Sequence, residues 1–203
     1  MAVLHPSPPF DDLTYYPTSR WIRGKRGRDT IVDSQRALLV WEPGKKVPIY
    51  AFPREDVALV SKDPAAIPSS QARGFADPDL AGYITIPWDS LDHWFEEDEE
   101  VFVHPRDPFV RVDALNSSRH VRVERDSHLL AESDSAILVF ETGLPTRYYL
   151  PERDVDQGLR QGFRMRSIER DAFTAATGYP PGLRINGIEL RDRVWLDRAV
   201  TRR

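Results

Sequence analysis

One glutamate, one arginine and two tyrosines lie close together within residues 136–155. Glu141 ends an apolar run just before a glycine turn, and Arg147, Tyr148 and Tyr149 follow that turn. A carboxylate at the end of a buried strand can act as a general acid or base, because desolvation raises its pKa. A guanidinium group binds carboxylates and phosphates through paired hydrogen bonds. These residues are therefore a candidate catalytic or ligand-binding site.

The strand predicted after the turn would arrange these side chains on two faces. Side chains alternate along a strand, so Arg147 and Tyr149 share one face and Tyr148 takes the other. Together with Thr146 and Glu141, Arg147 and Tyr149 would hold a small anionic ligand. In an enzyme, Glu141 would be the acid or base, with Tyr148 or Tyr149 as a hydrogen-bond donor. The competing interpretation is structural: Glu141 accepts hydrogen bonds from the turn, or pairs with Arg147 to close the hairpin.

A weaker candidate is a metal site formed by His93, Glu97 and His104. Pro87 is expected to begin a helix that places His93 and Glu97 four residues apart, with His104 downstream. That spacing would allow a histidine and a carboxylate to share a metal ion. Without a His-Glu-x-x-His pattern, it is more typical of the solvated end of an acidic helix. The helix itself is predicted from the apolar spacing of Trp88, Leu91, Trp94 and Phe95.

The segment around Glu141 has a counterpart in the first half of the chain. Residues 33–44 align with residues 132–143 without a gap, and residues 50–57 align with residues 148–155. Both copies contain an apolar strand, a Glu-x-Gly turn, a second strand and a Pro-x-x-Asp-Val segment. An internal duplication is the natural explanation of this order.

The pattern of short apolar and β-branched runs between turn residues predicts a mainly β (β-rich α+β) protein. We expect two duplicated small antiparallel β units with short helices. An irregular lead-in would cover residues 1–19, a first unit with a helix and linker residues 20–115, and a second unit residues 116–203. Pro48 aligns with Arg147, so only the second unit offers this arginine.

Composition and charge exclude several classes of function. The 203 residues include no cysteine, which rules out disulfides, a thiol nucleophile and thiolate-bound metals. The net charge of -4 argues against nucleic-acid binding. No apolar run approaches the ~20 residues of a membrane span, and the N-terminal residues lack the features of a signal peptide. We therefore expect a cytoplasmic protein with no cofactor, whose partner is a small molecule or a protein, with no nucleic acid and no membrane.

Five segments carry a resemblance to a known family: residues 33–57, 94–108, 111–113, 117–123 and 140–151. They resemble the domain of unknown function number 427 family, in its tandem form, over roughly residues 20–157. The stretch Glu141-Thr-Gly-Leu-Pro-Thr-Arg-Tyr-Tyr149 is quite specific. The resemblance implies a compact, mainly β domain and no established reaction. One classification label suggests nucleotidyl transfer, but the sequence has no Gly-Ser followed by an Asp-x-Asp pair that would hold a metal and a triphosphate.

The chain departs from the family after about Asp156. Family members continue into a Cys-Pro-Tyr-Lys-Gly-type segment and further strands, whereas residues 157–203 are rich in arginine. An altered reading frame near residue 157 would explain this divergent or truncated end, and resequencing around that codon would test it.

Three functional hypotheses follow. The first is a binding module for a small anionic ligand or a protein partner, centred on Glu141, Arg147 and Tyr149. The second is an enzyme acting on a small substrate, with Glu141 as acid or base. The third is a purely structural or vestigial protein. The sequence does not decide whether the protein is an enzyme.

Overall fold

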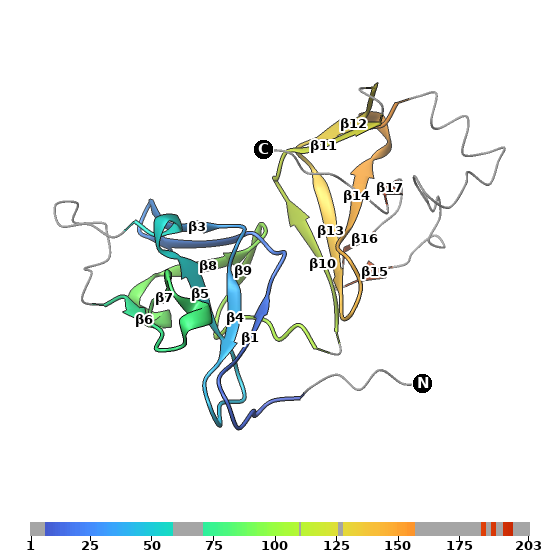
Figure 1. Ribbon diagram of the computed structural model, residues 1–203. Coiled ribbons are helices and arrows are strands. Elements are labelled where there is room, and N and C mark those ends of the chain that lie inside the picture. The colour runs from blue at the N-terminus through green and yellow to red at the C-terminus, as the bar shows by residue number, and fades with distance from the viewer. Residues whose placement is uncertain are drawn as a thin grey trace, which may run out of the picture. The chain divides into compact units, whose positions relative to one another are not determined.

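The chain folds as two compact units, Met1–Phe109 and Val110–Arg203 (Figure 1). Both consist of short strands in antiparallel sheets with single 3-10 turns, so the prediction of a mainly β protein is confirmed. Among the described residues, no helix has the length and apolar character that crossing a bilayer requires. This computed structural model describes residues 7–58, 71–109, 111–125 and 128–156, together with the strands at 184–185, 188–189 and 193–196.

The first unit contains a five-stranded and a four-stranded antiparallel sheet. In spatial order, the five-stranded sheet consists of β1 (Thr14–Pro17), β4 (Leu38–Trp41), β5 (Ile49–Pro53), β7 (Tyr83–Thr85) and β6 (Arg73–Gly74). The four-stranded sheet consists of β3 (Asp29–Ser34), β2 (Ile22–Arg26), β8 (His93–Glu96) and β9 (Glu99–Val101). The 3-10 turns of this unit are η1 (Arg54–Asp56), η2 (Pro78–Leu80) and η3 (Trp88–Ser90).

Strand β1 corrects the expectation of an irregular lead-in. It pairs with β4 from Thr14 opposite Trp41 to Pro17 opposite Leu38. The ring of Tyr16 meets the ring of Trp41 edge to face, with 6.0 Å between the ring centroids. This aromatic contact explains why a segment with several prolines is held as an edge strand.

An aromatic cluster occupies the core of the first unit. Trp94 of β8 stacks on Phe52 of β5 with 6.0 Å between centroids, and on Trp88 of η3 with 5.2 Å. The ring of Tyr50 lies 5.5 Å from that of Trp94. Phe52 and Trp94 are buried and come from different sheets, so the cluster joins the two sheets of this unit.

The helix predicted to begin at Pro87 is wrong. The chain forms one 3-10 turn, η3, and then enters β8, which pairs with β2 so that Trp94 lies opposite Gly24. Trp88 and Trp94 reach the same core cluster, one from a turn and the other from a strand, and this produces the helix-like spacing. The short helices expected after Pro53 and Pro151 are likewise single 3-10 turns.

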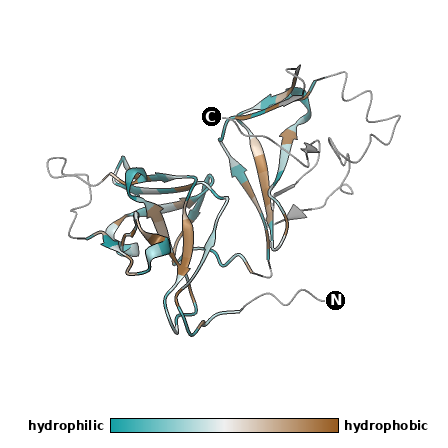
Figure 2. Cartoon of the chain, viewed as in Figure 1, coloured by the Kyte–Doolittle hydropathy of each residue, from teal (hydrophilic) through white to brown (hydrophobic). Residues whose placement is uncertain are grey.

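The second unit has a four-stranded sheet and two strand pairs. The sheet consists, in spatial order, of β10 (Val112–Ser117), β13 (Ala136–Glu141), β14 (Arg147–Pro151) and β17 (Arg193–Leu196). The pairs are β11 (Val121–Arg125) with β12 (His128–Ser133), and β15 (Arg184–Ile185) with β16 (Ile188–Glu189). The 3-10 turn η4 (Glu152–Asp154) follows β14. Figure 2 shows apolar residues along β4 and β13, the strands that precede the Glu-x-Gly turns.

Corresponding hydrogen bonds tie a strand to a 3-10 turn in both units. Ser34 donates its hydroxyl to Asp56 at 2.7 Å, and Ser133 donates its hydroxyl to Asp154 at 2.6 Å. Each serine ends a hairpin strand, and each aspartate ends the 3-10 turn that follows the next hairpin. The Pro-x-x-Asp-Val segment thus has the same structural task in both places.

The two Glu-x-Gly turns also share their backbone geometry. Gly44 has a φ of 73° and Gly143 a φ of 76°, in the left-handed region that glycine adopts without strain. In each turn, the residue after the glycine donates its backbone N–H to the carbonyl of Glu42 or Glu141, at 3.0 Å in both. The predicted strands on either side of these turns are confirmed.

The close approach of Trp94 to β2 predicts that Gly24→Ala destabilises the first unit. A Cβ at Gly24 would lie 2.4 Å from Leu91 Cδ1 and 3.1 Å from the Trp94 ring. We expect a loss of about 1–3 kcal/mol, the typical cost of overpacking. Urea unfolding followed by tryptophan fluorescence measures it. The matched control is Gly74→Ala, where a Cβ meets nothing within 4 Å, and an equal loss in both variants would contradict the packing explanation.

Candidate functional site

The Glu141 and Arg147 side chains form an ion pair across the hairpin of β13 and β14. Arg147 lies opposite Val139, and its Nη2 donates to Glu141 Oε2. The Arg147 side chain is 17% exposed and that of Glu141 is 35% exposed. The structure therefore brings these two predicted residues together, in the arrangement that closes the hairpin.

The Nε atom of Arg147 is buried and has no hydrogen-bond acceptor among the described residues. A buried donor without an acceptor is uncommon in folded proteins and carries a free-energy cost. Among the described residues, the Arg147 guanidinium thus has a hydrogen-bond acceptor for Nη2, which is Glu141, and none for Nε.

The two tyrosines after Arg147 differ in their surroundings. Tyr148 is half-buried and packs against the core cluster that contains Leu115 and Leu138. Tyr149 is only 2% exposed. Thr146, at the end of the turn, is half-buried. Of the predicted ligand-binding residues, Arg147, Glu141 and Thr146 have access to solvent, while Tyr149 lies within the fold.

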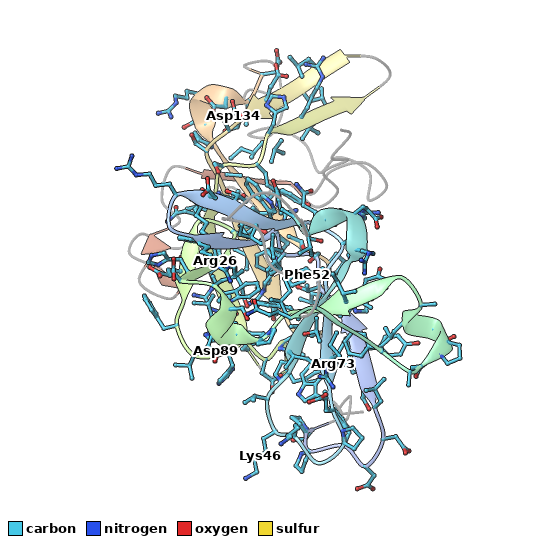
Figure 3. All side chains as sticks on the ribbon, turned by 90° about the vertical axis from the view of Figure 1, so that its left-hand side faces the viewer. Arg26, Lys46, Phe52, Arg73, Asp89 and Asp134 are labelled. Atoms are coloured by element: carbon cyan, nitrogen blue, oxygen red, sulfur yellow. The ribbon has the colours of Figure 1, made fainter. Side chains whose placement is uncertain are left out.

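Glu42 occupies the corresponding position in the first unit and also pairs with an arginine. Its Oε1 accepts from Arg73 Nη2 at 2.6 Å, and Arg73 comes from β6 rather than from the strand after the turn (Figure 3). The Arg73 side chain is well exposed, whereas that of Arg147 is largely buried. The two glutamates therefore have the same type of partner in different environments.

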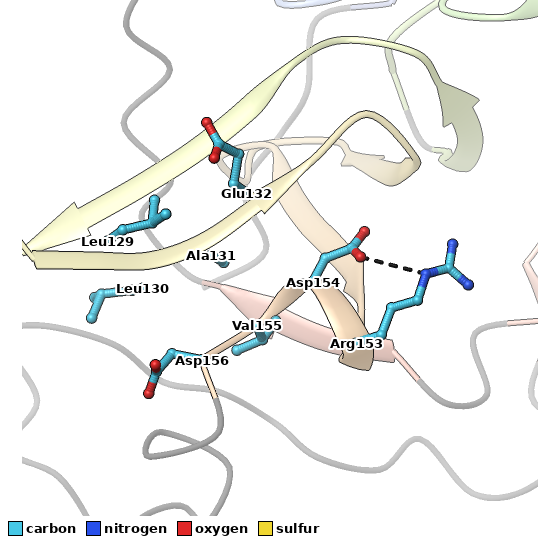
Figure 4. Close-up of a pocket in the computed structure, with 8 residues that line it drawn as sticks. All are labelled: Leu129, Leu130, Ala131, Glu132, Arg153, Asp154, Val155 and Asp156. Atoms are coloured by element: carbon cyan, nitrogen blue, oxygen red, sulfur yellow. Dashed lines mark ion pairs between the residues drawn. The ribbon is translucent and has the colours of Figure 1, made fainter.

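A cavity of about 340 Å³ lies between β12 and η4 in the second unit (Figure 4). Its floor is apolar and its rim carries Glu132, Asp154 and Asp156, with Arg153 beside Asp154 at 3.4 Å. Neither Glu141 nor Tyr148 lines this cavity. The cavity is lined by Leu129, Leu130, Ala131, Glu132, Arg153, Asp154, Val155 and Asp156.

The proposed metal ligands do not converge. His93 Nδ1 lies 2.6 Å from Glu100, while the buried Glu97 accepts from the backbone N–H of Trp21 at 2.8 Å. His104 Nδ1 faces the carbonyl of its own neighbour, Pro105. Across the described parts of the chain, no group of three or more acidic, histidine or cysteine side chains could hold a metal ion. The reason is that β8 replaces the helix on which the spacing depended.

The structure reveals a buried polar cluster, centred on Glu96, that the sequence reasoning missed. Glu96 is 1% exposed and forms an ion pair with Arg20. Its Oε1 accepts from the Tyr50 hydroxyl at 2.7 Å and from the backbone N–H of Arg106 at 2.9 Å. Burial, and then the negative charge of Glu96, raise the pKa of Tyr50 well above its ordinary value. Tyr50 therefore stays a hydrogen-bond donor across the physiological pH range.

One signal for this cluster was present in the sequence. In β8, the alternation of a strand places Trp94 and Glu96 on one face, toward the core. Glu97 then takes a φ of 52°, which turns the chain so that Glu97 is buried too. A run of five acidic residues suggested a solvated surface and concealed this alternation.

Comparison with known families adds one match. Residues 113–179 match the model of a domain of unknown function, DUF427. The resemblance inferred from the sequence is thus confirmed for the second unit, including the Glu141–Arg147 hairpin. The DUF427 match runs beyond Asp156, where we expected the resemblance to end. Comparison with curated proteins and with solved structures gave no match. Most of residues 157–203 lie outside the described part of the chain, and so does the altered reading frame predicted near residue 157.

A charged cluster formed by His120 before β11, Glu132 of β12 and Asp134 after β12 predicts a pH-dependent stability. His120 Nδ1 lies 2.8 Å from Asp134 Oδ1, and His120 Nε2 lies 3.1 Å from Glu132 Oε1. The hydrogen bond to Asp134, followed by the smaller contribution of Glu132, raises the pKa of His120 above its ordinary value. Because the folded pKa exceeds the unfolded one, the stabilisation is full below about pH 6.5 and is lost as pH rises through the folded pKa.

Nuclear magnetic resonance titration of the His120 ring, together with thermal melts across this pH range, tests the assignment. In Asp134→Asn, the pKa of His120 should fall toward its ordinary value, because the main partner loses its charge. His120→Gln should remove this contribution to the pH dependence altogether. An unchanged His120 titration in Asp134→Asn would contradict the pairing.

The burial of the Glu96 ion pair predicts a large effect of Glu96→Gln. The variant keeps the size of the side chain but removes the negative charge of Glu96 beside the buried Arg20, so we expect a loss of about 3–5 kcal/mol. Urea unfolding followed by tryptophan fluorescence reports on this unit, since Trp195 is the only tryptophan outside it. Glu42→Gln, at the exposed pair with Arg73, should cost about 1 kcal/mol or less. Similar losses in the two variants would show that burial does not set the energy.

Proposed function

We propose that the protein is a binding module for a small ligand bearing a carboxylate or phosphate group, anchored by Arg147 of the second unit. The observation that carries this proposal is the state of the Arg147 guanidinium. It is largely buried, paired with Glu141 at one end, and without an acceptor at Nε within the described parts of the chain. A guanidinium presents donors in a planar fork, so an anion that displaces Glu141 can engage two of them at once.

The turn beside Arg147 supplies an apolar contact for such a ligand. Leu144 is 53% exposed, and Pro145 next to it is exposed. The buried Tyr149 lies on the same face of β14 as Arg147 and serves as support rather than as a ligand contact. An exposed leucine beside a shielded arginine suits a ligand with both an anionic group and an apolar part.

We further infer that the two units arose by duplication and that anion binding was acquired by only one of them. The corresponding serine–aspartate bonds and glycine turns support the common origin. Ile49, rather than the Pro48 expected from the sequence, stands where the second unit has Arg147, since Ile49 lies opposite Val40 and Arg147 lies opposite Val139. A cytoplasmic location belongs to the same proposal and rests on the composition of the chain.

No specific observation favours the enzyme alternative. An acid–base role for Glu141 requires a substrate cavity beside it, and the cavity described in the second unit lies elsewhere. The carboxylate is instead engaged with Arg147.

Thermal-shift titrations with phosphate, small dicarboxylates and nucleoside monophosphates test the anion site. Arg147→Ala should abolish the rise in melting temperature given by any ligand that binds the native chain. Glu141→Gln should increase affinity about tenfold, because it removes the internal anion that competes for Arg147. A tenfold change in affinity corresponds to about 1.4 kcal/mol of binding free energy.

The matched controls are Arg73→Ala and Glu42→Gln, which change the exposed pair of the first unit. Both should respond to ligand like the native chain. Equal responses in Arg147→Ala and the native chain would eliminate Arg147 as the anchor. Weaker binding in Glu141→Gln would show that the carboxylate contacts the ligand rather than competing with it.

A further inference from the structure

Strands β2 and β11 occupy corresponding places in the two units but have different numbers of neighbours. In the first unit, β2 is hydrogen-bonded to β3 on one edge and to β8 on the other. Within the described part of the second unit, β12 is the only strand hydrogen-bonded to β11. An edge strand presents unpaired backbone N–H and C=O groups and is a template for another strand.

The register shows that this edge of β11, on which the described residues place no strand, is the edge that β8 covers on β2. Ile22 lies opposite Ser34, and Val121 lies opposite Ser133, at the same step before each serine–aspartate bond. Both hairpins shift register at the same step, after Gly24 in the first unit and after Val123 in the second. The inner edges of β2 and β11 therefore already have corresponding partners, and only the outer edges differ.

The first unit indicates what chemistry a strand on this edge would bring. There, Glu96 lies opposite Ile22, and Phe95 lies opposite Arg23 with 5.7 Å between the guanidinium carbon and the ring centroid. Corresponding positions in the second unit are Val121 and Arg122. A glutamate opposite Val121 would stand close to the buried Arg119, as Glu96 does to Arg20. An aromatic residue opposite Arg122 would stack on its guanidinium.

The strands β2 and β11 differ at one position that limits the size of the side chain lying opposite it on a neighbouring strand. Gly24 leaves room for Trp94, whose ring would lie 3.1 Å from a Cβ at Gly24. The second unit has Val123 at the corresponding place, and this valine is buried. A small residue, rather than tryptophan, must therefore lie opposite Val123.

We propose that the outer edge of β11 binds an extended acidic peptide segment of a partner protein as an antiparallel strand. The segment carries a small residue opposite Val123, an aromatic residue opposite Arg122 and a glutamate opposite Val121. Main-chain hydrogen bonds provide affinity in this mode, and the alternating side chains provide specificity. The proposal goes beyond the anion site and does not depend on it.

The probe is a synthetic peptide with the sequence of residues 91–98, carrying Trp94→Ala so that an alanine meets Val123. Hydrogen–deuterium exchange of the full-length chain is followed with and without this peptide, and fluorescence polarisation gives the affinity. We expect slower exchange in residues 121–125 and no change in residues 22–26, where β8 already covers the edge. The unsubstituted peptide should bind about tenfold more weakly, because its tryptophan overpacks against Val123.

Two N-methylated versions of the peptide provide the matched controls, each blocking the N–H groups of one edge. The version blocked on the edge that faces β11 should lose binding, and the version blocked on the opposite edge should keep it. Equal binding of both versions would overturn the proposal, as would an unchanged exchange rate in residues 121–125. Protection of these residues as strong as that of residues 22–26 before any peptide is added would also overturn it, since the chain itself would then cover the edge.

Discussion

The buried carboxylate of Glu96 is the interaction on which the first unit depends. It joins Arg20, which precedes β2, to Tyr50 of β5 and to the backbone of Arg106 after β9. A charge in such a place is tolerated only when it is paired and hydrogen-bonded. The pairing also fixes the register of β8, because a slip of one residue would turn Glu96 outward and Phe95 inward. Trp94 is thereby held over Gly24, and the aromatic cluster follows.

The strands could be predicted wherever an apolar run ends in a glycine turn. Residues 38–41 and 136–140 are continuous apolar stretches of strand length, and the φ values of Gly44 and Gly143 explain why glycine suits those turns. The region from Trp88 to Phe95 could not be predicted in the same way. Its side chains reach one cluster from a turn and a strand, so their spacing imitates a helix. In this segment, the packing of the tertiary structure determines the secondary structure, and the local spacing of apolar residues does not.

The candidate site was predictable only in part, for related reasons. Glu141 and Arg147 flank a short turn, so their ion pair followed from strand pairing alone. The burial of Tyr149 and the solvent access of Glu141 depend on what packs over each face, which no local pattern contains. The polar cluster at Glu96 was hidden for another reason. Its partners Arg20 and Tyr50 are far away in the sequence, and only the pairing of β2 with β8 brings Arg20 near.

The two units have the same internal hydrogen bonds and differ at the positions where we propose that a ligand or a partner binds. The bonds from Ser34 to Asp56 and from Ser133 to Asp154 hold corresponding elements together, so the scaffold constrains the residues that make them. Beside these bonds, Val123 stands where the first unit has Gly24, and Arg147 stands where the first unit has Ile49. In the first unit, the glycine admits Trp94 and the outer edge of β2 is closed by β8. In the second unit, the buried Val123 takes the place of that glycine, so the strand that we propose for this edge differs in sequence from β8. These differences lie outside the serine–aspartate bonds that hold the elements of each unit together.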